Sequence, residues 1–303
     1  MKNLLGSFFL VLTLLLPALA QDVLPPEGSR LIASGPDGVV LQWPGDARQR
    51  YFVQIYSGGV AAVEQEVTGN TIAVPLRGGL GYQWKVSRIE PSGGYSELVS
   101  NRNFQVVNDT SIVIAGSNGG KGRDGTYRTG YAGENGGAGG AGPNLTATLQ
   151  PMGIYVGLTI TGAPANRQLL LAPGSGPIML VSRGGQGGAG GAGANGQPAF
   201  FNVQTGYVSL PQPGGNGGVG GTGGAGGSIT VVSNGLEPAR YLQFDTSGGP
   251  GGAAGAPGRG GDRVTVPVDW RYGLPFGYAD VPAPNGQPGQ PGQPGQAGQV
   301  FYR

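Results

Sequence analysis

Glycine at every third residue constrains this chain more than any other feature. The period runs through six blocks, one of four triplets and five of five, and its glycines span 116–125, 130–142, 184–196, 214–226, 249–261 and 286–298. A helix of polyproline-II type has three residues per turn, so one side of each block carries only glycine, and another backbone can approach there. Fifteen such residues make a rod about 45 Å long. Six rods of matched length can therefore lie side by side.

Three kinds of structure share this period. The chain has 65 Gly and 25 Pro among 303 residues, a level typical of collagen-like or low-complexity sequences. The blocks are short for a collagen triple helix, and a disordered tract has no reason to stop repeatedly after the same count. The pattern favours an intramolecular polyglycine-II bundle, whose rods share N–H and C=O groups that have no partner within their own rod. Collagen-like trimers and disorder stay open as alternatives.

Triplet composition predicts the place of each rod. A rod with two glycines per triplet can be approached on two sides, so the central rods are expected at 136–141, 184–192 and 214–228. Larger side chains predict edge rods at 116–127 and 286–299. The links read as strand, turn and strand, for example at 229–244. We therefore expect short β-hairpins at the rod ends, and the sequence leaves open whether successive rods run parallel or antiparallel.

The first twenty residues are typical of an export signal. Lys2 precedes an apolar run, Leu4 to Leu16, and Ala18-Leu19-Ala20 gives a small-residue cleavage pattern. The rival interpretation is a membrane anchor, but the apolar run is short for a bilayer, which needs about 20 residues. We expect a secreted or cell-surface protein without a membrane span in the mature chain, and a periplasmic location stays open.

Residues 24–107 show short alternating strands broken by turn signals. Trp43 lies late in the second strand, and Leu76 is followed six residues later by Tyr82, which opens an alternating run. In these features the segment resembles a fibronectin type III domain. The resemblance implies a seven-stranded sandwich in which Trp43, Tyr82 and Trp84 are core residues.

The predicted fold class is therefore all-β plus polyglycine-II. A signal peptide occupies residues 1–20, a fibronectin III-like β-sandwich residues 21–108, and a six-rod bundle linked by short β-hairpins residues 109–303. A β-domain followed by matched Gly-X-X blocks resembles the polyglycine-II bundles of bacteriophage tail-tip adhesins and of the springtail antifreeze protein. The resemblance implies either loops at the end of the bundle that bind a surface, or a flat face that binds ice.

Composition argues against catalysis and against nucleic-acid binding. The chain has no His and no Cys, which removes the commonest proton shuttle, metal ligand and thiolate nucleophile. We expect no enzyme, no cofactor and no metal site, although Asp269 and Asp280 stay as carboxylates for a carbohydrate-active enzyme. A formal net charge of +2 gives no electrostatic footprint for nucleic acid.

The sequence thus predicts a secreted, non-enzymatic surface or matrix protein whose stiff region presents loops for adhesion. Its partner would be a surface protein or glycan, and self-association stays open. The candidate binding residues are aromatic side chains of the links, for which core packing at the rod ends is the alternative and, residue by residue, the favoured explanation: Phe200, Phe201, Tyr207, Trp270, Tyr272, Phe276 and Tyr278. The alternative is an ice-binding protein that uses small third-position side chains: Val219, Thr222, Ala225 and Ser228.

Overall fold

The structure, a computed structural model, forms two compact units. It describes residues 23–33, 38–127, 131–162, 166–202, 204–205, 207–264 and 281–303. The first unit ends at Val107 and the second begins at Asn108. Both units are built from strands, and the described ranges contain no α-helix. The predicted export signal lies outside the described residues.

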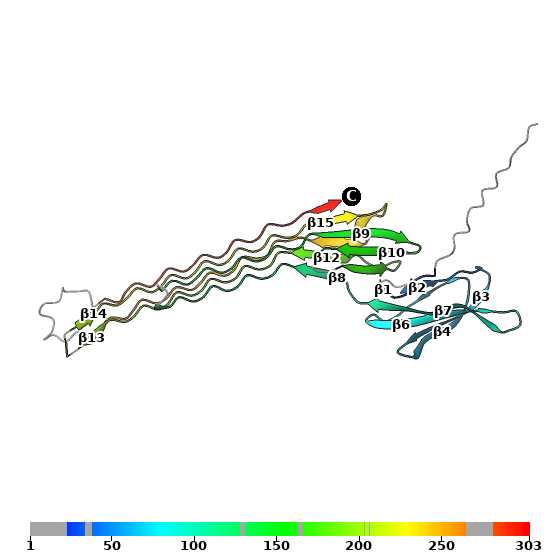
Figure 1. Cartoon of the computed structure of the whole chain (residues 1–303), viewed down its shortest axis with the longest axis horizontal. Coiled ribbons are helices and arrows are strands. Elements are labelled where there is room, and N and C mark those ends of the chain that lie inside the picture. Colours follow the sequence, from blue (N-terminus) through cyan, green and yellow to red (C-terminus); the bar gives the residue numbers. More distant parts are fainter. Residues whose placement is uncertain are drawn as a thin grey trace, which may run out of the picture. The chain divides into compact units, whose positions relative to one another are not determined.

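The first unit consists of two facing groups of strands (Figure 1). Its strands are β1 (Ser29–Ile32), β2 (Val39–Gln42), β3 (Arg50–Ser57), β4 (Val60–Thr68), β5 (Thr71–Val74), β6 (Leu80–Ile89) and β7 (Tyr95–Val107). One sheet has the order β1-β7-β6-β3-β4, with β1 parallel to β7 and the other pairs antiparallel. The other sheet pairs β2 with β5. A β-rich structure fits the sandwich predicted for this segment.

Large aromatic side chains fill the interior of the first unit. Trp43 and Trp84 are fully buried, and the ring of Trp43 meets the edge of Tyr51 at a centroid distance of 5.5 Å. The hydroxyl of Tyr82 donates to the carbonyl of Arg77 at 2.9 Å. This bond from the start of a strand back to the chain a few residues upstream is the geometry of a tyrosine corner.

The second unit alternates strands with glycine-rich segments. Its elements are β8 (Ser111–Ala115), β9 (Leu145–Met152), β10 (Tyr155–Thr161), β11 (Arg167–Leu171), β12 (Ile178–Arg183), β13 (Phe200–Asn202), β14 (Tyr207–Ser209), β15 (Ile229–Val232), the 3-10 helix η2 (Pro238–Arg240), β16 (Leu242–Asp245) and β17 (Val300–Tyr302). Strands β17-β15-β9-β10-β11 are neighbours in one sheet, β16-β12-β8 form a second, and β13 pairs with β14. Apolar side chains of β9, β10, β12 and β15 are buried.

The predicted fold class is wrong for this unit. A six-rod polyglycine-II bundle linked by short hairpins was expected, but the unit is a β structure whose glycine blocks are extended connections between strands. The link 229–244 shows why the local pattern misled. Its strand β15 pairs with β9 and β17, whereas its strand β16 pairs with β12. The two strands therefore belong to different sheets, and their partners lie far away in the sequence.

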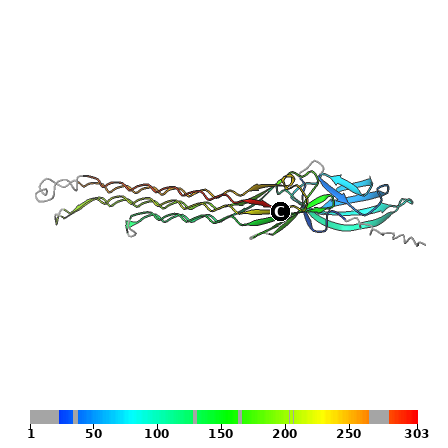
Figure 2. The same ribbon diagram turned by 90° about the horizontal axis from the view of Figure 1, so that it is seen from above.

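Backbone hydrogen bonds join the glycine-rich segments side by side (Figures 1 and 2). We number these segments 1 (116–126), 2 (131–143), 3 (184–197), 4 (212–228), 5 (246–262) and 6 (283–299). Apart from segment 1, each segment donates N–H groups to the segment before it, as Gly218 does to Gly191. Segments 1 to 4 also donate to the segment two further along, as Gly220 does to Gln290, both at 2.8 Å.

These bonds define two layers, with segments 1, 3 and 5 in one and segments 2, 4 and 6 in the other. Strands β8, β12 and β16 lead into the first layer, and they pair in parallel. Strands β9, β15 and β17 follow the second layer and also pair in parallel. Segments of one layer therefore run parallel, and successive segments run antiparallel, which resolves the direction that the sequence left open.

The number of neighbours explains where glycine is required. Segments 3 and 4 each bond to four others. In segment 4 a Cβ on Gly220 would lie within 3.0 Å of the Gly252 oxygen, and one on Gly221 would strike the Gly137 oxygen. In the outer segments, which have fewer neighbours, glycine is not required at every such position. A Cβ on Gly120 in segment 1 would meet nothing within 4 Å.

Candidate functional site

The hairpin β13–β14 connects segments 3 and 4 at the end opposite to β8, β9, β12 and β15 (Figure 1). Its turn is held by the side chain of Asn202, whose Oδ1 accepts the N–H groups of Gln204 at 2.9 Å and Thr205 at 3.3 Å. The Phe200 N–H donates to the hydroxyl of Ser209 at 2.9 Å. Side-chain acceptors thus fix a two-stranded element of only three residue pairs.

One face of this hairpin carries two exposed aromatic rings. Phe200 pairs with Ser209, and Asn202 pairs with Tyr207, so these four residues share a face. Phe200 is 57% exposed and Tyr207 is 62% exposed. Phe201 lies on the opposite face and is half-buried. The arrangement offers rigid, uncharged surface for contact with a partner.

The structure therefore brings together two of the seven predicted binding residues, Phe200 and Tyr207. It separates Phe201 from them because side chains alternate along a strand. The remaining four candidates lie outside the described residues: Trp270, Tyr272, Phe276 and Tyr278. Asp269 and Asp280, the carboxylates considered for catalysis, also lie outside them.

A second aromatic pair lies where segment 1 ends and segment 2 begins. The rings of Tyr127 and Tyr131 meet edge to face at a centroid distance of 5.6 Å, and Tyr127 is 65% exposed. Burial of the Tyr131 hydroxyl, followed by the nearby Tyr127, raises the pKa of Tyr131. Sequence reasoning did not select this pair. Its signal was the slip at 128–129, where the three-residue spacing of glycine is interrupted.

The outer faces of the two layers are lined by the third residue of each triplet. Val219 is 41% exposed, Thr222 and Ala225 are also exposed, and Ser228 is half-buried. Asparagine at such a position bridges to the neighbouring segment of its layer. The Oδ1 of Asn135 accepts the Val219 N–H at 2.9 Å, and Asn118, Asn144, Asn195 and Asn216 make equivalent bonds. Asp124 does the same for the Ala192 N–H.

Nowhere in the described ranges do three or more His, Cys, Asp or Glu side chains gather so that they could hold a metal ion. None of the helices in the described part of the chain is long and apolar enough to cross a bilayer.

Comparison with known proteins gave no relative. No family model matches the chain, and neither the curated proteins nor the solved structures contain a match.

Proposed function

We propose that this protein is a secreted, non-enzymatic surface protein that presents the β13–β14 hairpin to a partner on a cell or matrix surface. One observation carries the proposal. Segments 3 and 4, each backbone-bonded to four other segments, lead to a hairpin whose exposed face holds Phe200 and Tyr207. A support whose backbone is paired along its length loses little conformational entropy when its tip binds. Aromatic side chains supply contact area at a low cost in rotamer entropy.

Bead adhesion tests this proposal. Beads coated with the purified protein are counted on a layer of cells, and the double variant Phe200→Ala/Tyr207→Ala is compared with the wild type. We expect the variant to lose most of the adhesion, because truncation of central aromatic anchors typically costs more than about 2 kcal/mol each. Tyr95→Ala is the matched control, since Tyr95 is 60% exposed on β7 of the first unit. Equal adhesion of the double variant and the wild type would refute the proposed site.

We also propose that the first unit has fibronectin type III architecture. The support is the pairing of β2 with β5 in one sheet, the order β7-β6-β3-β4 in the other, and the bond from Tyr82 to Arg77. In this proposal the unit is a spacer that carries the glycine-rich unit. An experimental structure of residues 21–108 with a different strand order would refute the architecture.

A second candidate function, ice binding, rests on the outer face of segment 4. Val219, Thr222 and Ala225 are small, exposed and spaced by three residues along a straight segment. Ala138 and Ala141 of segment 2 are exposed in the same layer. Thermal hysteresis measured on concentrated protein separates the two functions. Absence of hysteresis would remove ice binding, and hysteresis that disappears in Thr222→Lys would support it.

A further inference from the structure

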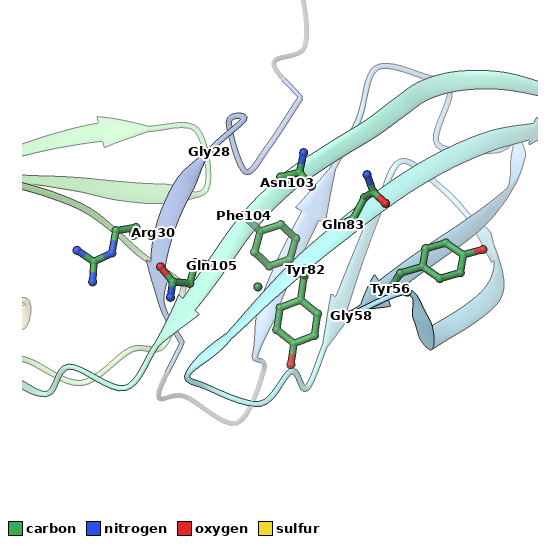
Figure 3. A pocket seen from close by; sticks show the side chains of 11 residues that line it. Gly28, Arg30, Tyr56, Gly58, Tyr82, Gln83, Asn103, Phe104 and Gln105 are labelled. Carbon is green, nitrogen blue, oxygen red and sulfur yellow. The ribbon is translucent and has the colours of Figure 1, made fainter.

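A shallow depression of about 530 Å³ lies on the larger sheet of the first unit (Figure 3). Residues of β1, β3, β6 and β7 line it, together with glycines of the turns that precede β1 and β4. Besides Tyr82, whose hydroxyl donates to Arg77, five of its lining side chains carry polar groups: Arg30, Tyr56, Gln83, Asn103 and Gln105. Their arrangement follows from the register of the sheet.

Two cross-strand rows build the depression. Tyr56 of β3 pairs with Gln83 of β6, and Gln83 pairs with Asn103 of β7. In the next row Gly81 pairs with Gln105, and Gln105 pairs with Arg30 of β1. Residues two apart on a strand share a face, so the two rows face the same way. A phenol, three carboxamides and one guanidinium therefore lie in the two rows that contain Gly81. Figure 3 shows these side chains on neighbouring strands of the sheet.

Gly81 forms the floor of the depression, and the fold does not require a glycine there. A Cβ at this position would meet nothing within 4 Å, and the backbone of Gly81 does not adopt the left-handed conformation that favours glycine. Gly28 and Gly58, at the rim, have φ angles of 72° and 57°, which explain their identity. Glycine inside a strand weakens the strand and often marks a place where a ligand comes close. The missing side chain at residue 81 keeps the depression open.

The lining side chains offer hydrogen-bond donors and acceptors and one fixed aromatic ring to a polar ligand. The carboxamides of Gln83 and Gln105 form no hydrogen bond to other described residues, and each can both donate and accept. The Tyr56 hydroxyl accepts from Gln54 Nε2 at 2.7 Å and donates to Glu64 Oε1 at 3.3 Å. These bonds fix the ring of Tyr56, and Lys85 Nζ lies 5.8 Å from the ring centroid.

We propose that this depression binds an acidic saccharide chain. Sugar hydroxyls are donors and acceptors at once, which matches the two carboxamides. The C–H face of a sugar ring can pack against a fixed aromatic ring, which Tyr56 supplies. None of the lining residues is Asp or Glu, and the carboxylates beside the lining, Glu27 and Glu64, already accept hydrogen bonds from Asn103 and Tyr56. Arg30 and the neighbouring Lys85 bring positive charges that suit a sugar carboxylate. An open, shallow site accommodates part of a longer chain.

Calorimetric titration of the full chain with a galacturonic acid hexamer tests the proposal, and cellohexaose serves as the neutral probe. We expect the acidic hexamer to bind with a Kd of about 1 mM or tighter. Gly81→Leu should weaken this binding by about tenfold or more, because its side chain fills the floor. Gly94→Leu is the matched control, since Gly94 is exposed and has ordinary backbone geometry outside the depression.

Three outcomes would overturn the proposal. The first is that neither hexamer binds the wild type, and the second is that Gly81→Leu binds as tightly as Gly94→Leu. The third is that cellohexaose binds as tightly as the acidic hexamer, which would remove the role of charge. Because the depression and the hairpin β13–β14 belong to different units, failure of this test leaves the proposed adhesion site untouched.

Discussion

The largest buried side chains of the first unit are Trp43, Trp84 and Tyr51, whereas the buried residues of segments 3 and 4 are mostly glycines. In the sandwich, side-chain volume fills the space between two sheets, and burial of apolar surface supplies most of the stability. In the glycine segments the backbone itself is the packed surface. Neighbouring glycine segments are joined by one hydrogen bond from N–H to C=O in each triplet. The sandwich is therefore sensitive to lost volume, and the glycine segments are sensitive to added volume.

The same contrast recurs within the glycine segments. Residues 184–191 of segment 3 and 214–227 of segment 4 tolerate no Cβ at two positions of each triplet. In segment 4, Gly220 donates its N–H to segment 6, the next segment of the same layer. Segment 6 has no such acceptor among the described segments, and its equivalent positions are prolines: Pro288, Pro291 and Pro294. Proline has no N–H to leave unpaired. Proline at this margin resembles the way sheets protect exposed edge strands.

The largest effect is expected from lost volume in the sandwich. Trp84→Ala should lower the free energy of unfolding of the first unit by about 3–5 kcal/mol, because a fully buried indole is replaced by a cavity. Urea denaturation followed by Trp43 fluorescence measures this loss. Trp84→Phe is the control, since the Trp84 Nε1 has no hydrogen-bond partner in the structure, and it should cost less. An alanine variant as stable as the phenylalanine variant would contradict a core role.

Added volume in a central segment should be nearly as damaging. Gly220→Val places a side chain against the Gly252 oxygen and would force segments 4 and 5 apart. Loss of the bonds from Gly249, Gly252 and Gly255 to segment 4 would cost about 3 kcal/mol in sum. A thermal melt followed by far-ultraviolet circular dichroism should lose its cooperativity. Gln290→Val, on the exposed side of segment 6, should melt like the wild type, and equal effects of the two variants would contradict the layers.

A smaller effect is expected at the asparagine bridges. Asn135→Ala removes the acceptor of the Val219 N–H and should lower the free energy of unfolding by about 1 kcal/mol. Ala138 lies one triplet further along, beside Thr222. Ala138→Asn should introduce a bridge to the Thr222 N–H and raise the thermal midpoint. Paired melts of the two variants measure the opposite shifts, and a shift of the same sign in both would refute the bridging role.

Part of this structure could be predicted from local patterns. The second glycine in each triplet of 136–141, 184–192 and 214–228 predicted close approach on two sides. Segments 3 and 4 do bond to four neighbours, but segment 2, which contains 136–141, bonds to only three. The spacing of glycines in the sequence reveals such positions, because a Cβ at any one of them would clash with the backbone of a neighbouring segment. Strand pairing is different. Ile229 pairs with Leu145, which is 84 residues away, and nothing in the link 229–244 identifies that partner. The hairpin expected in the link 229–244 was therefore wrong, although β13 and β14 in the link between segments 3 and 4 do pair with each other.

At the candidate site, too, local sequence patterns predicted some features, whereas others depend on strand pairing. Composition identified Phe200, Phe201 and Tyr207 as aromatic residues of a link, but only the register places Phe201 on the opposite face. The depression around Gly81 was not predicted. Its glycine stands out only when the space above it is known to be empty and its backbone is known to be ordinary.

The smallest expected effect concerns the pH dependence of the bridge that the Asp124 carboxylate makes to segment 3. Asp124 accepts the Ala192 N–H at 2.9 Å and lies 3.1 Å from Lys121 Nζ, and these contacts, the N–H first, hold the pKa of its carboxyl below the usual value. The folded-state pKa is thus lower than the unfolded-state value of about 3.9. The stabilisation is present above the unfolded-state pKa and disappears as the pH falls through the folded-state pKa.

Asp124→Asn keeps the acceptor and removes the titration, as the neutral bridges of Asn135 and Asn195 do. When the pH is lowered from about 6 to about 2, the thermal midpoint should therefore fall less in the variant than in the wild type. The difference should be small because Asp124 is exposed and salt screens its charge. The same fall in both proteins would show that the carboxylate contributes nothing beyond its role as an acceptor, and the bridge would then depend on geometry alone.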